Sequence, residues 1–172
     1  ILLSLMGVAE YAGVFIAQFV GAQLPEKVGK VLWQSLLISF TGALIFIAIS
    51  FFSKGLFALA GHESRLQVME VEYFRILCLG GGFPLVTASL SCFFSGRGQT
   101  RPVMVANIVA ALVNIPMDYI LIFGKFGFPE MGIAGAALAT VLGWVTGGLI
   151  MGLLVFRPKY EARYKVWSSR GL

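Results

Sequence analysis

Five long apolar runs restrict this chain to one kind of fold. The runs lie near residues 1–20, 31–53, 71–95, 101–123 and 131–156. Each is close to the roughly 20 residues that a helix needs to cross the hydrocarbon core of a bilayer. Only 12% of the residues are charged, against about 25% in soluble domains. Because a segment in lipid must satisfy its own backbone hydrogen bonds, the sequence predicts an all-α integral membrane protein with five transmembrane helices.

Lysine and arginine are divided unequally between the two ends of the predicted helices. One end carries nine, namely Lys27, Lys30, Arg97, Arg101, Arg157, Lys159, Arg163, Lys165 and Arg170. The other carries four, Lys54, Arg65, Arg75 and Lys125, offset by Glu63, Glu70, Glu72 and Glu130. The positive-inside rule places the richer end in the cytoplasm. Ile1 is then outside, Leu172 is inside, and residues 157–172 form a basic cytoplasmic linker. The net charge of +5 follows from this topology and gives no reason to expect a nucleic-acid partner.

The fourth run, RPVMVANIVAALVNIPMDYILIF, carries polar residues inside an apolar span. At roughly 100° per residue, Asn107, Asn114 and Asp118 fall within an arc of about 40° on one helix face. Placing a charge at the centre of a bilayer costs at least about 2.5–3.5 kcal/mol, so such groups usually mark an ion or substrate pathway. The alternative is a buried polar cluster that only holds helices together.

Two prolines are candidate hinges. Pro116 lies between Asn114 and Asp118 and cannot donate a hydrogen bond to the carbonyl of Leu112. Pro84 follows three consecutive glycines, 80–82, in the third run. Such a stretch favours a kink or a close approach of two helices.

The last run carries small residues at helical spacing and one hydroxyl at a useful depth. Gly132, Ala136, Thr140, Gly143 and Gly147 share a face that would permit close backbone approach to a neighbouring helix. The turn before this run is centred near residue 128, so Thr140 should lie at nearly the depth of Asp118 on the adjacent antiparallel helix. If the two faces turn toward each other, the hydroxyl reaches the carboxylate.

The first run adds a second acid, Glu10, and an amide, Gln18. Glu10 either lines the same pathway as Asp118 or lies near the outer membrane interface. Gln18 is a further candidate for the pathway, together with Asn107.

The sequence offers no catalytic constellation. Its one histidine, His62, falls in the connection 54–70, and no metal-binding spacing accompanies it. HExxH and GxSxG patterns are absent, and no predicted span contains a histidine. We therefore expect a protein that is not an enzyme, with no cofactor and no metal unless Asp118 binds Na⁺.

Four motifs together resemble the multidrug and toxic compound extrusion (MATE) transporters. They are AQFVGA at 17–22, FFSGRGQTRP at 93–102, NIPMDYILIFG at 114–124 and MGIAGAALAT at 131–140. The resemblance covers essentially the whole chain. It implies a fold of twelve helices in two lobes, with residues 1–156 forming part of the N-terminal lobe, helices two to six. A first helix and a C-terminal lobe of the same protein would then be missing, which agrees with a chain that begins inside an apolar run.

The resemblance also implies a function. MATE transporters export organic cations and drugs across the cytoplasmic membrane in exchange for H⁺ or Na⁺, so the lipid bilayer and small cationic substrates would be the partners. Their N-lobe cation site uses an aspartate on helix one, which cannot be checked here. The Asn and Asp of helix five correspond to Asn114 and Asp118, and the Thr of helix six corresponds to Thr140. Glu10 has no counterpart in this pattern.

Two other functions compete with cation export. One is a lipid or polysaccharide flippase of the same superfamily, which would line its cavity with basic residues for anionic headgroups. The acids within the predicted spans and the bases at their ends favour cationic cargo instead. The other is a scaffold subunit without a pathway.

Overall fold

The computed structural model describes residues 2–59 and 61–170, and every regular element in this part of the chain is helical. Five stretches are long and apolar enough to cross a membrane, which confirms the predicted fold class. They are Leu2–Gly21 (α1, Leu2–Glu10, and α2, Ala12–Gly21), Pro25–Phe51 (η1, Pro25–Lys27, and α3, Val28–Phe51), Ser64–Ser95 (α5, Ser64–Gly80, and α6, Gly82–Ser95), α7 (Arg101–Phe123) and α8 (Gly132–Val155). The short elements are α4 (Ser53–Ala58), η2 (Pro158–Tyr160), α9 (Glu161–Tyr164) and η3 (Ser168–Arg170).

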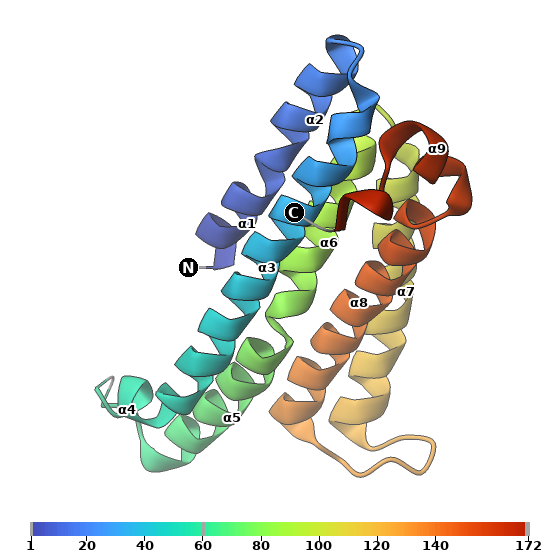
Figure 1. The fold of residues 1–172 in the computed structure, drawn as a ribbon. Coiled ribbons are helices and arrows are strands. Elements are labelled where there is room, and N and C mark those ends of the chain that lie inside the picture. The colour runs from blue at the N-terminus through green and yellow to red at the C-terminus, as the bar shows by residue number, and fades with distance from the viewer. Residues whose placement is uncertain (1, 60, 171–172) are drawn as a thin grey trace.

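The helices form two groups that meet along α6. The α7–α8 hairpin lies on one side, and α1, α2 and α3 lie on the other (Figure 1). The larger core cluster joins α2, α3, α6 and α8 at one end of the bundle through fully buried side chains such as Ile16, Leu32, Phe93 and Met151. The outer faces carry exposed leucines and phenylalanines, as lipid-facing surfaces do.

Buried serines join α3 to α6. The hydroxyl of Ser89 lies 2.5 Å from that of Ser35 and 2.8 Å from that of Ser39. Ser39 donates to the carbonyl of Leu85, and Ser35 donates to the carbonyl of Ala9 on α1. All three serines are at most 3% exposed, so the polar atoms satisfy one another and fix three spans in one register.

The glycines of the third run stand where it is interrupted. Helix α5 ends at Gly80 and α6 begins at Gly82, with Gly81 between them. A Cβ at Gly80 would overlap the side chain of Val141 on α8, and one at Gly82 would lie 2.6 Å from Cβ of Ala43 on α3. The absence of side chains here lets this span pack closely on both of its neighbours.

Small residues also bring α7 and α8 together. A Cβ at Gly135 would lie 2.6 Å from the carbonyl carbon of Leu121, and one at Gly143 would lie 3.1 Å from Cβ of Asn114. A Cβ at Gly132 would meet nothing within 4 Å. The close face therefore includes Gly143 and Gly147, as expected, but it runs through Gly135 rather than Gly132.

We predict that Gly135→Ala destabilises the hairpin, because the new methyl group would collide with backbone atoms that cannot rotate away. The expected cost is about 1–3 kcal/mol, seen as a lower unfolding temperature of the purified protein in detergent. Gly152→Ala is the matched control on the same helix. Its Cβ would lie 4.0 Å from Cδ1 of Leu90, an ordinary contact. Equal losses for both variants would contradict this account of the packing.

Residues 157–170, expected only as a basic linker, are folded onto one end of the bundle. Val166 is fully buried, and its carbonyl accepts a hydrogen bond of 2.6 Å from the indole Nε1 of Trp33. The guanidinium carbon of Arg97 lies 4.9 Å and 4.7 Å from the ring centres of Tyr160 and Tyr164. Such cation–π contacts fasten the segment to the end of α6.

An acid closes the turn of this segment. The backbone N–H of Trp167 donates to the Glu161 carboxylate at 2.6 Å, and the N–H of Ser168 donates to it at 3.1 Å. These hydrogen bonds lower the pKa of Glu161 below its usual value, and the bond from Trp167 has the largest effect. A depressed carboxylate pKa means that the turn is stabilised while Glu161 is ionised, and that this stabilisation is lost as the pH falls through the lowered pKa.

We therefore predict that Glu161→Gln speeds hydrogen exchange at the amides of Trp167 and Ser168 at pH 7. Acidifying the unsubstituted protein through the lowered pKa should likewise lower the protection factors of these two amides, which compare their exchange with the intrinsic rate at each pH. Exchange measured by mass spectrometry or NMR would test both. Glu63→Gln, at an exposed acid elsewhere, is the control. Unchanged protection in Glu161→Gln would show that the carboxylate does not hold the turn.

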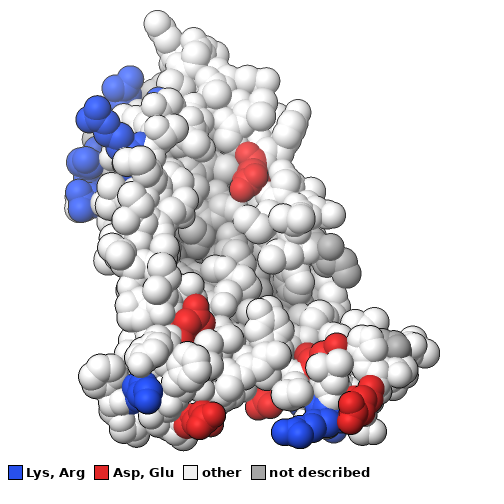
Figure 2. All heavy atoms as spheres, turned by 180° about the vertical axis from the view of Figure 1, so that it is seen from behind, with Lys and Arg blue, Asp and Glu red and all other residues white. Residues whose placement is uncertain are grey.

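Charged residues gather at the two ends of the molecule. Figure 2 shows Lys and Arg clustered at one end, both signs mixed at the other, and a hollowed face between them on which isolated acidic groups stand. The termini Ile1 and Leu172, for which we predicted opposite sides of the membrane, lie outside the described residues. The orientation stays a prediction.

Cysteine labelling tests the orientation. Ser64 and Ser168 are both exposed, near opposite ends of the bundle, whereas Cys78 and Cys92 are buried and should react slowly. We expect Ser64→Cys to react with an impermeant maleimide added to intact cells, and Ser168→Cys to react only after the cells are opened. The reverse pattern would invert the topology.

Candidate functional site

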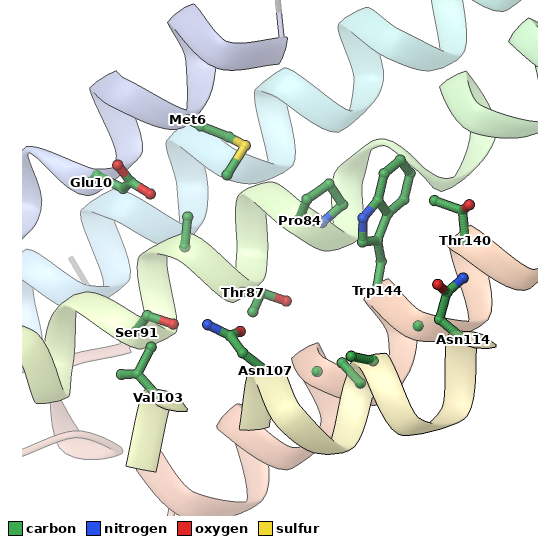
Figure 3. Close-up of a pocket in the computed structure, with 15 residues that line it drawn as sticks. Met6, Glu10, Pro84, Thr87, Ser91, Val103, Asn107, Asn114, Thr140 and Trp144 are labelled. Atoms are coloured by element: carbon green, nitrogen blue, oxygen red, sulfur yellow. The ribbon is translucent and has the colours of Figure 1, made fainter. Parts of the chain in front are cut away.

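A cleft of about 430 Å³ opens between the two helix groups. Its walls come from α1, α6, α7 and α8, so it lies where the α7–α8 hairpin diverges from the rest of the bundle (Figure 3). The lining is mostly apolar, with a few polar side chains that converge on the space. This composition is typical of a binding site for a small organic molecule.

One half of the cleft is built around Glu10 and Asn107. Figure 3 shows Glu10 and Met6 of α1 across from Asn107 of α7, with Thr87 and Ser91 of α6 between them. The hydroxyl of Thr87 donates to the carbonyl of Phe83 at 2.8 Å within its own helix. Its lone pairs therefore stay available to a ligand.

The other half is built around Asn114 of α7 and Thr140 and Trp144 of α8. The close approach at Gly143 sets Asn114 against α8. Thr140 donates to the carbonyl of Ala136 at 3.0 Å, so it too offers lone pairs. Asn107, Asn114 and Thr140 thus line one cleft together.

Asp118 lies just beyond the cleft. It is half-buried on α7, one turn past Asn114, and is not among the described residues that line the space. Asn114 lies against Gly143 and Leu121 against Gly135, a register that places Asp118 at the depth of Leu138 and Ala139, one or two residues from Thr140. In the described part of the chain, however, the only hydrogen bond of the Thr140 hydroxyl goes to Ala136. The role of Asp118 in coupling stays a prediction.

Glu10 lines the cleft from the first span, at the residue where α1 is followed by α2. Helix α1 ends at Glu10 and α2 begins at Ala12. Ser35 donates to the carbonyl of Ala9 at 3.1 Å, and the thiol of Cys92 donates to that of Glu10 at 3.4 Å. Glu10 thus lines the same cleft as Asn107 and Asn114, and its place on a transport pathway stays a prediction.

Of the remaining candidates Pro84, Pro116 and Gln18, only Pro84 is among the described residues that line the cleft. Pro84 lines the cleft three residues after the interruption at Gly81. Pro116 is exposed within an α7 that continues unbroken from Arg101 to Phe123. Gln18 is exposed on α2 and is not among the described residues of the cleft lining. The hinge role of the two prolines stays a prediction.

The described residues contain no cluster of three or more His, Cys, Asp or Glu side chains that could hold a metal ion. A Na⁺ ion near Asp118 would have to complete its shell with amide, hydroxyl and carbonyl oxygens, as in helices that line transport sites. His62 is 2.9 Å from Glu70 in an exposed ion pair far along the chain from the cleft.

Sequence reasoning missed two features of the site. Trp144 supplies a large aromatic face, but a tryptophan in an apolar run looks like any lipid-facing residue. Ser35, which holds α1 in place, and Ser39, which bonds α6, belong to a run whose composition is otherwise uniformly apolar. Their four-residue spacing, continued by Gly42 and Phe46 at three and four residues, is a signal that could have revealed a packed face.

Comparison with known proteins supports one family. The model of the MatE family matches residues 1–120. The "Probable multidrug resistance protein NorM" of Thermotoga maritima is 33% identical over 166 residues, which are 92% of this chain and 36% of that protein. The "Multidrug resistance protein NorM" of Vibrio cholerae is 27% identical over 154 residues, 90% of this chain and 34% of that protein.

A solved structure shares the fold. It is described as the inward-facing conformation of a multidrug resistance MATE family transporter, and it superposes with a TM-score of 0.79 at 24% identity. The match covers 96% of this chain and 40% of that one. The chain spans about a third of the length of the curated relatives it matches, 36% and 34% for the two above.

Proposed function

Because the chain belongs to the MatE family, we propose that it is part of an antiporter, driven by H⁺ or Na⁺, that exports organic cations and drugs across the cytoplasmic membrane. The observation that supports this proposal is the cleft. It contains a carboxylate and several amide and hydroxyl groups, and no Lys or Arg is among the described residues that line it.

The lining suits a lipophilic cation. Glu10 supplies a negative charge, the indole of Trp144 offers a face to a cationic or aromatic group, and Met6 adapts to apolar shapes. A volume of about 430 Å³ is within the range of roughly 300–1,000 Å³ that drug-sized ligands occupy. Nothing in this arrangement requires bond chemistry, so we propose a carrier rather than an enzyme.

A flippase for anionic headgroups fits the cleft less well. Such cargo needs basic side chains in the cavity, because a buried phosphate is stabilised by Arg or Lys. Arg75 of α5 lines a separate groove with Lys54, Gln67 and Glu72. The charge of the cleft therefore favours cationic over anionic substrates.

Ion coupling is assigned to Asp118 with Asn114 and Thr140. Protonation of Asp118, or binding of Na⁺ to it, would remove a negative charge next to the cleft and so weaken the hold on a cationic substrate. Pro116 lies between Asn114 and Asp118. Because proline has no backbone N–H, the carbonyl of Leu112 lacks its usual hydrogen-bond donor in the helix. Bending there would change the shape of the cleft as the charge state changes.

Alternating access would require the rest of the transporter. Secondary transporters of this kind move one repeat or bundle against another around a site near the membrane midplane. The first helix and the second lobe, together with this part of the chain, would close the face on which the cleft now opens.

We predict that Asp118→Asn in the complete transporter abolishes ion-coupled efflux and leaves the protein folded and inserted. The amide keeps the shape of the side chain but fixes it in the neutral state. Drug efflux from everted vesicles, with an imposed H⁺ or Na⁺ gradient, measures the effect. Asn114→Ala should weaken coupling less, because it removes a supporting ligand and leaves the charge.

The control is Glu130→Gln, an exposed acid in the turn between α7 and α8. It should retain normal efflux. If Asp118→Asn exports drug at the normal rate with unchanged ion dependence, the carboxylate is structural and the assignment is wrong.

A further inference from the structure

We propose that Glu10 is the carboxylate that binds the cationic group of the substrate, in a subsite formed with Thr87, Ser91 and Asn107. This inference rests on the proposed export function and adds to it. It separates the acid that recognises the substrate from the acid assigned to ion coupling, and it defines the chemical class of the ligand.

The backbone beside Glu10 is fixed before any ligand arrives. The carbonyl of Ala9 accepts from Ser35, and that of Glu10 accepts from Cys92. Ser35 is in turn held by Ser89 of α6. The carboxylate therefore projects into the cleft from an anchored position, as a preorganised binding group requires.

The charge of Glu10 is left for a ligand. In the described residues its carboxylate has neither a hydrogen bond nor an ion pair, and the single ion pair found there joins His62 to Glu70. A cation bound here would pair with this charge.

The opposite walls offer oxygen acceptors and apolar surface. The hydroxyl of Thr87 donates to the carbonyl of Phe83 and keeps its lone pairs. The side chains of Ser91 and Asn107 make no hydrogen bond in the described structure, so both are available to a ligand. Figure 3 shows these three groups on the side of the cleft that faces Glu10, with Met6 and Val103 nearby. The set matches an ammonium or an amino-substituted aromatic cation with an apolar body.

The subsite is distinct from the coupling site. Asn107 and Asp118 are eleven residues apart on one continuous helix, which corresponds to about 16 Å along its axis. A substrate group held between Glu10 and Asn107 would not touch Asp118. The two acids can therefore be changed independently.

The test is equilibrium binding of ethidium, a monovalent aromatic cation with amino groups, to the purified complete transporter. Glu10→Gln should raise the dissociation constant roughly tenfold to a hundredfold, the usual effect of losing a charged hydrogen-bond partner. Glu72→Gln is the control, because Glu72 is an exposed acid of α5 that lines a different groove. It should leave the dissociation constant unchanged.

A second variant guards against misfolding of the first. The double substitution Ser91→Ala with Asn107→Ala removes no hydrogen bond of the described fold and should also weaken ethidium binding severalfold. Unchanged affinity in Glu10→Gln, or in the double variant if Glu10→Gln does not fold, would overturn the proposal.

Transport assays separate the two claims. If the unsubstituted transporter binds ethidium through Glu10 but does not exchange it for H⁺ or Na⁺ in vesicles, the antiport function fails and the subsite stands. If it exchanges ethidium and Glu10→Gln binds and exports it normally, the function stands and the subsite fails.

Discussion

The contact between α3 and α6 through Ser35, Ser39 and Ser89 is the interaction on which the rest of the structure depends. Lipid offers these hydroxyls no partner, so they can be accommodated only where they bond to one another and to backbone carbonyls. The same Ser35 reaches Ala9 and fixes the end of α1. One wall of the cleft is thus set by a polar contact, and the other by the close glycine contacts between α7 and α8.

Features that depend on a single helix, or on one hairpin, could be predicted from the sequence. The five spans follow from length and composition, because the bilayer imposes both. Asn107 and Asn114 share a face by helical geometry alone, and both line the cleft. The turn between α7 and α8 predicts that Asp118 and Thr140 lie at similar depths, since an antiparallel hairpin with a short turn has little freedom of register, but the joint site of these two residues stays a prediction.

Features that depend on contacts between segments far apart in the sequence could not be predicted. Nothing in the run 31–53 predicts that Ser35 and Ser39 will face Ser89, because the partner lies fifty or more residues away. The folding of residues 157–170 depends on Trp33 of α3 and on Arg97, just after α6, so the basic composition suggested only a linker. Glu10 was ambiguous for the same reason: its position is set by Ser35 and Cys92, not by its own helix.

The distance between the proposed subsite and Asp118 constrains how the proposed coupling can work. A cation held beside Asn107 would lie about 16 Å from Asp118 along α7, and two unit charges at that separation interact by only about 1 kcal/mol at an effective dielectric constant of about 20. Neutralising Asp118 would therefore change the affinity of such a cation about fivefold by electrostatics alone. Moving a conformational equilibrium from one side to the other needs about 5.5 kcal/mol. Direct competition for charge is too weak to drive such a shift, so we propose that a coupling ion at Asp118 would act mainly by changing the shape of α7. Pro116 lies between the cleft and Asp118, where a change in bend would move Asn107 relative to Glu10.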